Sequence, residues 1–447
     1  MTLQFFNTFG RKKEIFKPLK GKEVRMYTCG LTVYDYGHIG NYLALVNSDI
    51  LRRYLEFKEY RVQKIVNITD VDDKTIRRSI KEGKSLKEFT QLYEKAFFED
   101  EKKLNIKKAT HYPRATDHIK EMVALIETLL KKGIAYTTES GIYFNIRKFK
   151  DYGILSGVRL EKLQDGASSR VVKDEYEKEN AADFALWKFY TPDDGGVFWE
   201  TTLGKGRPGW HIECSAMSSK YLGQPFDIHT GGIDLVFPHH ENEIAQSEGA
   251  AGKKFANYWI HNEFLMVNGK KMSKSLGNFY TVRDIFNLAI DPLALRYFYI
   301  TGHYRTQLNF TLDNLTNALH SLQRLKNILS ACKDDKKINR KYLKKFEDAM
   351  DDDLNTPKAL EIVWEFLRDE KTYGKIQTMK KIDSVLGLDL LKKEKNNVPP
   401  AVMKLVNERE KARREKDWTL ADALREKIKG EGFSVDDTDD GVTVRKI

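Results

Sequence analysis

The stretch that best indicates the fold of this chain is Val24-Arg25-Met26-Tyr27-Thr28-Cys29-Gly30-Leu31-Thr32-Val33-Tyr34-Asp35-Tyr36-Gly37-His38-Ile39-Gly40-Asn41. Residues 24–28 have the composition of a short strand, a glycine-bearing loop follows, and apolar residues then recur at helical spacing. Such a junction directs free backbone N–H groups at the edge of a sheet, where an anionic phosphate binds well. We therefore expect a phosphate site here, flanked by His38 and Asn41.

The alternation of strand and helix continues outward from this stretch. Residues 62–68 form a second predicted strand, which leads through the polar loop 69–74 into a helix. The strand pattern resumes, after a long interruption, at 226–229 and 258–261. This order predicts an α/β fold with a doubly wound, parallel, Rossmann-like catalytic sheet that is split by an insertion.

Further patterns organise the interruption and the C-terminal half. An amphipathic helix (119–130), a hairpin around 139–141 and a charged surface loop reaching Asn180 are expected in the insertion. Asn268-Gly269 predicts a second hairpin, and the regularly spaced leucines of 312–329 predict an α-helical bundle. After a charged linker, a basic helical region and a strand pair predict a small α+β module. The predicted domains are a catalytic domain (1–115 and 201–262), a connective insertion (116–200), a lysine-loop and stem-contact region (263–310), the helical bundle (311–392) and the C-terminal module (393–447).

Composition limits the class of protein. The chain has 447 residues, of which 76 are Lys or Arg and 65 are Asp or Glu, for a net charge of +11. This excess fits a polyanionic partner and a merely soluble basic surface about equally. With three cysteines, no basic-then-apolar start and no long apolar run, the sequence argues against a disulfide framework, a signal peptide and a membrane span. A cytoplasmic protein is expected.

The richest chemistry lies in residues 209–246, which include Trp210-His211-Ile212-Glu213-Cys214 and Phe237-Pro238-His239-His240-Glu241-Asn242-Glu243. Pro238 is a favourable first helical residue, so His239 and Glu243, four apart, are expected on one helix face. Two such donors need soft partners from elsewhere in the chain to bind zinc rather than magnesium, and the cysteines are Cys29, Cys214 and Cys332.

Two motifs resemble those of the class I aminoacyl-tRNA synthetases. His38-Ile39-Gly40-Asn41 stands where that class has His-Ile-Gly-His, and Lys271-Met272-Ser273-Lys274-Ser275 matches its second signature without a substitution. Each motif is a modest signal alone, but the ordered pair, with each member on the expected kind of loop, is strong.

Longer matches are similar to the cysteinyl-tRNA synthetase family in particular, and the resemblance covers essentially the whole chain. They are the segments 27–35, 67–74, 209–215, 231–243 and, within the insertion, 183–188. The resemblance implies one zinc ion per chain, bound by Cys29, Cys214, His239 and Glu243. Each of these residues taken alone could be an ordinary core or surface residue, but jointly that alternative is improbable. Cys332 is expected to be an ordinary free cysteine.

The resemblance also implies a reaction in two steps. The cysteine carboxylate attacks the α-phosphate of ATP, supplied with Mg²⁺, and a terminal ribose hydroxyl of tRNA(Cys) then accepts the cysteinyl group. His38, Asn41, Lys271 and Lys274 would align and neutralise the phosphates, and all but Lys271 are assigned to ATP binding as well. Family likeness places the amino acid near Thr69, Trp210 and Asp234, the last as partner of the amino group.

Zinc would distinguish cysteine from serine, because a thiolate is a far better zinc ligand than a hydroxyl. Size alone separates these two amino acids poorly. Four protein ligands normally close a zinc site. The substrate sulfur is therefore expected either to add as a fifth ligand or to displace the Glu243 carboxylate.

The C-terminal module is a candidate for anticodon binding. Its basic region could follow the phosphate backbone or could be a solvated helix face, and Trp418 could stack on a base or pack internally. The basic residues in question are Arg409, Lys411, Arg413, Arg414 and Lys416. A monomer is expected.

Two alternatives compete with cysteine–tRNA ligation. A ligase of the same ancestry that joins cysteine to an amino sugar, as in mycothiol biosynthesis, would share the metal and nucleotide motifs but would have little use for a basic tail. A non-catalytic, zinc-stabilised nucleic-acid-binding protein would have no need of the lysine loop.

Overall fold

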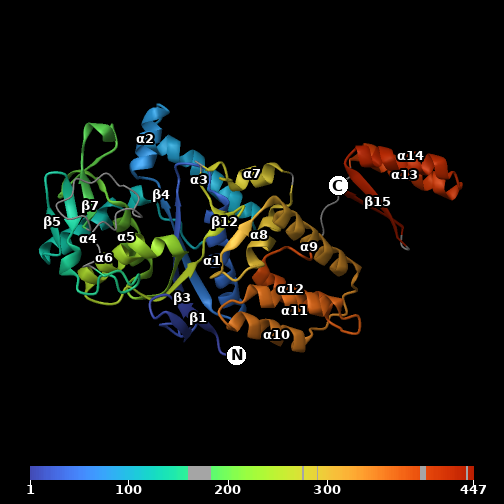
Figure 1. The fold of residues 1–447 in the computed structure, drawn as a ribbon, viewed down its shortest axis with the longest axis horizontal. Helices are drawn as coiled ribbons and strands as arrows, with labels where there is room; N and C mark the ends of the chain where they lie inside the picture. Colours follow the sequence, from blue (N-terminus) through green and yellow to red (C-terminus); the bar gives the residue numbers. More distant parts are fainter. Residues whose placement is uncertain (160–182, 274–275, 289, 393–398, 439–440, 447) are drawn as a thin grey trace. The chain divides into compact units, whose positions relative to one another are not determined.

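The computed structural model of the chain describes residues 1–159, 183–273, 276–288, 290–392, 399–438 and 441–446. The chain divides into two compact units, Met1–Leu390 and Leu391–Ile447 (Figure 1). Most of the predicted charged loop up to Asn180 lies outside the described residues. Among the residues that are described, no helix is both long and apolar enough to cross a bilayer.

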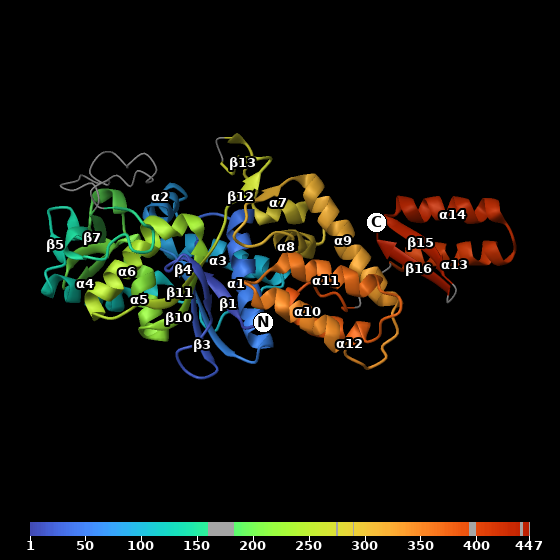
Figure 2. The same cartoon turned by 60° about the horizontal axis from the view of Figure 1, so that its bottom comes forward.

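A four-stranded sheet lies at the centre of the first unit (Figure 2). Its strands run in the order β11-β10-β3-β4, and every neighbouring pair is parallel. These strands are β3 (Glu23–Thr32), β4 (Arg61–Thr69), β10 (Phe226–Gly232) and β11 (Ala256–Asn262). The order places strands that are distant in sequence side by side, as the doubly wound α/β prediction requires, and that prediction is confirmed.

Helices cover this sheet. The helix α1 packs against β3, β4 and β10, and α5 packs against β3 and β4 and contacts α4 and α6. A large apolar core joins α5 to the sheet and the insertion, with Trp187 and Trp259 completely buried in it. The helices are α1 (Ile39–Phe57), α2 (Asp73–Lys81), α3 (Leu86–Lys103), α4 (Ile119–Lys131), α5 (Trp210–Leu222) and α6 (Glu241–Ala251).

The insertion builds a second sheet of its own, with strand order β5-β6-β7-β9-β8. Its first two strands form the hairpin expected around 139–141. The strands are β5 (Ala135–Thr137), β6 (Gly141–Phe144), β7 (Phe184–Phe189), β8 (Trp199–Thr201) and β9 (Gly204–Pro208). Ion pairs from Lys188 and Arg207 to Asp73 fasten this sheet to the start of α2.

The segment after the sheet carries the predicted hairpin and the helical bundle. Strand β12 pairs with β13 across Asn268-Gly269 and lies parallel to β14. Strands β1 (Gln4–Asn7) and β2 (Lys12–Ile15) form a separate hairpin. The later elements are β12 (Leu265–Val267), β13 (Lys270–Lys271), α7 (Val282–Asn287), α8 (Pro292–Ile300), β14 (Leu308–Phe310), α9 (Leu312–Ala331), α10 (Arg340–Asp351), α11 (Thr356–Arg368) and α12 (Lys375–Leu386).

A fully buried ion pair connects α1 to α8. The guanidinium of Arg296 donates to Asp49 at 2.6 Å, and Arg53 donates to the same carboxylate at 2.7 Å. Burial by itself would raise the pKa of Asp49, but these two cations lower it to about 2. The helix that begins at the first signature, α1, is thus tied to α8, the second helix after the other signature.

The second unit consists of α13 (Pro400–Arg414), α14 (Trp418–Gly430), β15 (Phe433–Thr438) and β16 (Gly441–Lys446). It confirms the predicted helical region and strand pair, and it has a small apolar core of its own. One expectation is wrong: Arg409 is only 2% exposed and donates to both oxygens of Asp437, so it cannot follow a phosphate backbone. Trp418, in contrast, is 58% exposed.

Candidate functional site

The first signature forms the N-terminus of α1. His38 is the N-cap residue: the backbone N–H of Asn41 donates to His38 Nδ1 at 3.1 Å, and the N–H of His38 donates to Asn41 Oδ1 at 3.0 Å. This reciprocal arrangement satisfies two backbone donors that would otherwise lack partners. It gives the asparagine at the fourth position of the motif a structural task besides any contact with phosphate.

The second signature follows the β12–β13 hairpin, with Lys271 exposed at its end and its Nζ 5.2 Å from the centre of the Phe264 ring. Asn278 holds the loop that follows. Its Oδ1 accepts from Ser273 N–H at 2.9 Å, and its Nδ2 donates to the carbonyls of Lys271 and Val267. Lys274 lies outside the described residues, so its predicted role stays a prediction.

The structure brings the two signatures into contact. Val282 N–H donates to the Gly37 carbonyl at 3.0 Å, and Ile39 N–H donates to the Tyr280 carbonyl at 3.1 Å. A Cβ atom on Gly40 would lie 3.5 Å from the terminal methyl group of Met272. The loop that caps α1 and the loop that carries the lysine therefore share one border, as a common phosphate site would require.

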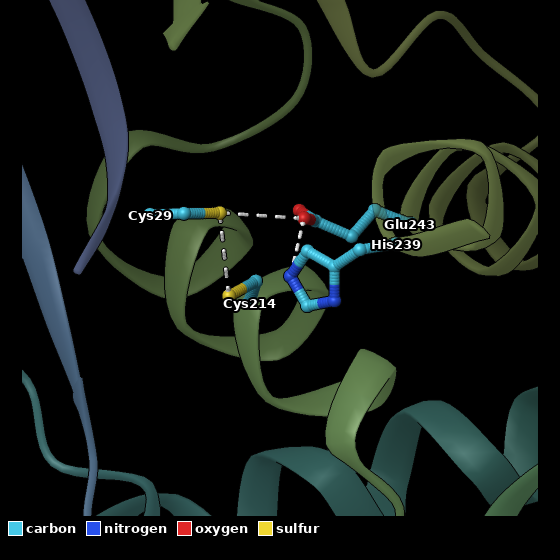
Figure 3. A group of neighbouring side chains, drawn as sticks. All are labelled: Cys29, Cys214, His239 and Glu243. Atoms are coloured by element: carbon cyan, nitrogen blue, oxygen red, sulfur yellow. Dashed lines mark hydrogen bonds and ion pairs between the residues drawn. The ribbon is translucent and has the colours of Figure 1, made fainter. Parts of the chain in front are cut away.

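The four predicted metal donors converge within 4.8 Å of one another (Figure 3). They come from the end of β3 (Cys29), from α5 (Cys214), from a π-helical segment Val236–His240 (His239) and from α6 (Glu243). Tetrahedral zinc with Zn–S bonds of about 2.3 Å holds two thiolates roughly 3.8 Å apart. The sulfurs of Cys29 and Cys214 lie 3.9 Å apart, so the donor set fits zinc.

The expected pairing of His239 with Glu243 is confirmed, and so is the start of a helical turn at Pro238. His239 Nε2 lies 3.1 Å from Glu243 Oε1. Phe237 has an extended backbone conformation, so the helical turn that carries His239 starts at Pro238 and continues directly into α6, which is regular α-helix from Glu241. The four-residue spacing still places both side chains together across the π-helical segment.

Electrostatics favour the metal-binding forms of two donors. Burial raises the pKa of Glu243, but the imidazoles of His229 and His239 outweigh it and lower that pKa to about 2. Burial likewise raises the pKa of Cys214, which hydrogen bonds from Cys29 and His239 lower to about 6. Burial and the adjacent Cys214 raise the pKa of Cys29 well above its usual value. One thiolate and one carboxylate are thus favoured at neutral pH.

Four further histidines surround the cluster and were not predicted from the sequence. His211 Nδ1 lies 2.9 Å from His239 Nδ1, and His229 Nε2 lies 2.9 Å from Glu243 Oε2. The other two are His240 and His261, and His240 Nδ1 lies 2.7 Å from His261 Nε2. The sequence did carry a signal, because two of these residues end the strands predicted at 226–229 and 258–261, and neighbouring parallel strands end at the same edge of a sheet.

The three residues assigned to the amino acid lie at the carboxyl edge of the sheet or beside the cluster. Trp210 begins α5, is 38% exposed, and has its ring centre 4.3 Å from that of His239. Burial raises the pKa of Asp234, and the charges of Lys271 and His239 are close enough to oppose this rise. Thr69 is the buried last residue of β4. Their roles in binding cysteine stay predictions.

Comparison with known proteins extends over the whole chain. Residues 15–320 match the family described as tRNA synthetases class I (C) catalytic domain, residues 345–391 match a DALR domain, and residues 395–445 match the cysteinyl-tRNA ligase anticodon binding domain. The cysteine–tRNA ligase of Brachyspira hyodysenteriae is 47% identical, with 98% of each chain covered. That of Thermococcus onnurineus is 42% identical, with 100% of each chain covered.

A solved structure has the same fold. Methionyl-tRNA synthetase of Mycobacterium tuberculosis, in complex with methionyl-adenylate, has a TM-score of 0.60 over 82% of this chain and 89% of that chain. Its sequence identity is only 13%, so the likeness concerns the fold alone. The full-length relatives and the catalytic domain establish an enzyme, and the non-catalytic alternative is rejected.

Proposed function

The chain belongs to the cysteine–tRNA ligase family of class I aminoacyl-tRNA synthetases, and we propose that it activates L-cysteine with ATP and transfers it to tRNA(Cys). The observation that carries the proposal is the convergence of two thiols, an imidazole and a carboxylate beside the shared border of the two signatures. Selection of the amino acid and its activation are thereby assigned to neighbouring parts of one edge of the sheet.

We propose that Cys29, Cys214, His239 and Glu243 bind one zinc ion. When bound, zinc would supply a Lewis-acidic partner that prefers the substrate thiolate to the hydroxyl of serine. Trp210 would form the exposed wall of the amino-acid site next to His239, and Asp234 would accept a hydrogen bond from the substrate ammonium group. Thr69, at the end of β4, would contact the remainder of the amino acid.

The phosphates of ATP, together with Mg²⁺, are assigned to the border between the signatures. The N-terminus of α1 supplies backbone N–H groups there, and His38 and Asn41 maintain its geometry through their reciprocal hydrogen bonds. Lys271 and Lys274 would neutralise charge that develops on the α-phosphate as the cysteine carboxylate attacks it. Pyrophosphate leaves as the cysteinyl adenylate forms, and a ribose hydroxyl at the 3′ end of tRNA then takes the cysteinyl group and releases AMP.

We assign the second unit to recognition of the tRNA anticodon. Trp418 and Leu420 are exposed at the start of α14, and Lys411, Arg414 and Lys416 are exposed on or just after α13. An exposed indole beside exposed cations suits a base that stacks and a backbone that is negatively charged. A monomer in the cytoplasm is the proposed working form.

The test is cysteine-dependent exchange of pyrophosphate into ATP by the zinc-loaded protein, followed by charging of tRNA(Cys), with serine assayed in parallel. Exchange with cysteine, little exchange with serine, and charging of the tRNA are the expected results. Absence of exchange would overturn the proposal. Ligation of cysteine to an amino sugar, with exchange but without tRNA charging, would favour the alternative ligase, against which the anticodon binding domain at residues 395–445 argues.

A further inference from the structure

Cys29 and Glu243 belong to two different groups of candidate metal donors. The outer pair is Cys214 and His239, which complete the proposed zinc site. The inner pair is His229 and His240, and with Cys29 and Glu243 it forms a second group whose donor atoms also lie within 4.8 Å of one another. The two groups share two of their four members.

The distances from the shared donors are similar on both sides. Cys29 Sγ lies 3.9 Å from Cys214 Sγ in the outer pair and 3.3 Å from His240 Nε2 in the inner pair. The two oxygens of Glu243 are divided in the same way: Oε1 lies 3.1 Å from His239 Nε2, and Oε2 lies 2.9 Å from His229 Nε2. The carboxylate thus faces an imidazole in each direction.

His240 has the supporting contacts that are typical of a metal-binding histidine. Its Nδ1 lies 2.7 Å from His261 Nε2, and His261 Nδ1 lies 2.8 Å from Thr8 Oγ1, which leaves His240 Nε2 directed at Cys29. Metal-bound histidines usually make such a bond through the nitrogen that does not bind the metal. The backbone at Gly231 also confines the ring, because a Cβ there would lie 2.7 Å from His240 Cε1.

His229 is otherwise unexplained. It is completely buried, its ring stacks on Trp259 at 4.5 Å, and among the described residues its Nδ1 has no hydrogen-bond partner. Its other ring nitrogen, Nε2, faces Glu243 Oε2 at 2.9 Å and is the atom that would act as a metal donor.

We infer that His229 and His240 are a second donor pair for the ion that Cys29 and Glu243 bind. This inference rests on the proposed function, because it presupposes that the outer set binds zinc. The outer pair adjoins the exposed Trp210, whereas the inner pair adjoins the buried Trp259. When Cys214 and His239 do not bind the metal, the inner pair would keep it in the protein. Cys29 would then be the one thiolate that remains bound.

The experiment is a double-mutant cycle on metal affinity in the full-length protein. Cys214→Ser disables the outer set, His240→Asn disables the inner set, and the third variant combines them. Zinc affinity is measured by competition with a chelator. Bound thiolates are counted from the sulfur-to-metal charge-transfer band after substitution with Co²⁺, a readout that does not depend on activity.

Cys214→Ser is expected to retain one Co²⁺ with a charge-transfer band reduced to that of a single thiolate. His240→Asn should weaken zinc binding little in the natural sequence but roughly tenfold or more in the Cys214→Ser background. His211→Asn is the matched control, because His211 Nδ1 lies 2.9 Å from Nδ1 of His239 in the outer set. The effect of His211→Asn on zinc affinity should be smaller in the Cys214→Ser background than in the natural sequence.

Equal effects of His240→Asn in both backgrounds, or complete loss of metal from Cys214→Ser, would overturn the inference and leave the proposed zinc site intact. If the unaltered protein bound neither zinc nor Co²⁺, the proposed function would fail as well. Should Cys214→Ser not fold, as judged by circular dichroism, His239→Asn disables the outer set in the same cycle.

Discussion

The metal cluster and the lysine loop are built in opposite ways. The four donors of the cluster come from separate elements, are largely buried, and are each held by other side chains of the cluster. The lysine loop projects Lys271 into solvent, and hydrogen bonds from the side chain of Asn278 hold its backbone.

The difference corresponds to two chemical tasks. A metal distinguishes a thiolate from a hydroxyl best when its protein ligands are already in place. If substrate binding had to arrange those ligands, the binding energy used for that would not contribute to the preference for the thiolate. Neutralising a phosphate requires a cation that admits a large, hydrated substrate and contacts it closely only during the reaction. The proposed function therefore assigns selection to a buried site and activation to an exposed loop.

The strongest test of this division is His239→Ala. Activation of cysteine should fall on the order of 1000-fold, because the proposed zinc site loses one of its four ligands and, with the metal, the Lewis acid that would bind the substrate thiolate. Bound zinc and the preference for cysteine over serine should disappear together, as measured by metal analysis and pyrophosphate exchange. His118→Ala is the control, since His118 is equally buried but bonds to the Arg114 carbonyl and Tyr221 instead. Retention of zinc and selectivity would remove His239 from the site.

Lys271→Ala and Lys274→Ala should show the opposite pattern. Activation should fall by about 100-fold, because one charge-stabilising donor is lost from the transition state, while zinc content and thermal stability stay unchanged. Single-turnover formation of the adenylate measures the effect. Lys270→Ala, the exposed neighbour in the same hairpin, should change the rate by no more than about twofold. Loss of zinc from Lys271→Ala or Lys274→Ala would contradict the separation of metal binding from phosphate binding.

Asp49→Asn tests the buried ion pair that connects α1 to α8. The pKa of Asp49 in the folded protein is about 2, below its ordinary value of 3.8, so the folded state binds fewer protons than the unfolded state. The ion pair should therefore contribute about 2 kcal/mol of stability above pH 4, and this contribution should be lost as pH falls toward 2. Urea unfolding should show that Asp49→Asn destabilises the protein far more at pH 6 than at pH 2.5.

Asp193→Asn, which alters an exposed carboxylate of the insertion, is the control and should have little effect at either pH. A pH-independent difference between Asp49→Asn and the natural sequence would show that Asp49 acts through packing rather than through its charge.

The smallest effect is expected for Asn278→Ala. Three hydrogen bonds hold the loop, and replacing them with bonds to water at a net cost of about 1.4 kcal/mol should slow adenylate formation by about tenfold. Zinc content should be normal, and the loss should appear in kcat more than in the KM for cysteine. An unchanged kcat would show that the backbone of the loop positions the lysine without this side chain.

Much of the fold followed from local patterns. The strand, glycine loop and helix at 24–57, the resumption of strands at 226 and 258, and the Asn268-Gly269 hairpin all depend on short-range preferences that neighbouring residues express by themselves. The burial of Arg409 was missed because its partner, Asp437, lies 28 residues further along the chain. Charge and helical periodicity cannot indicate such a pairing.

The sequence by itself determined which donors and signatures this protein has, since thiols, imidazoles and lysines at these positions have a chemistry that does not depend on the fold. Only the tertiary structure decided how they meet. A register shift between Thr28 and Leu31 in the β3–β4 pairing lies beside Cys29, and it requires glycine at position 30, where a Cβ would lie 1.8 Å from the Asn67 carbonyl oxygen. The four further histidines gather because strands from distant segments end, and helices begin, at one edge of the sheet, and contact across that edge depends on packing rather than on sequence spacing.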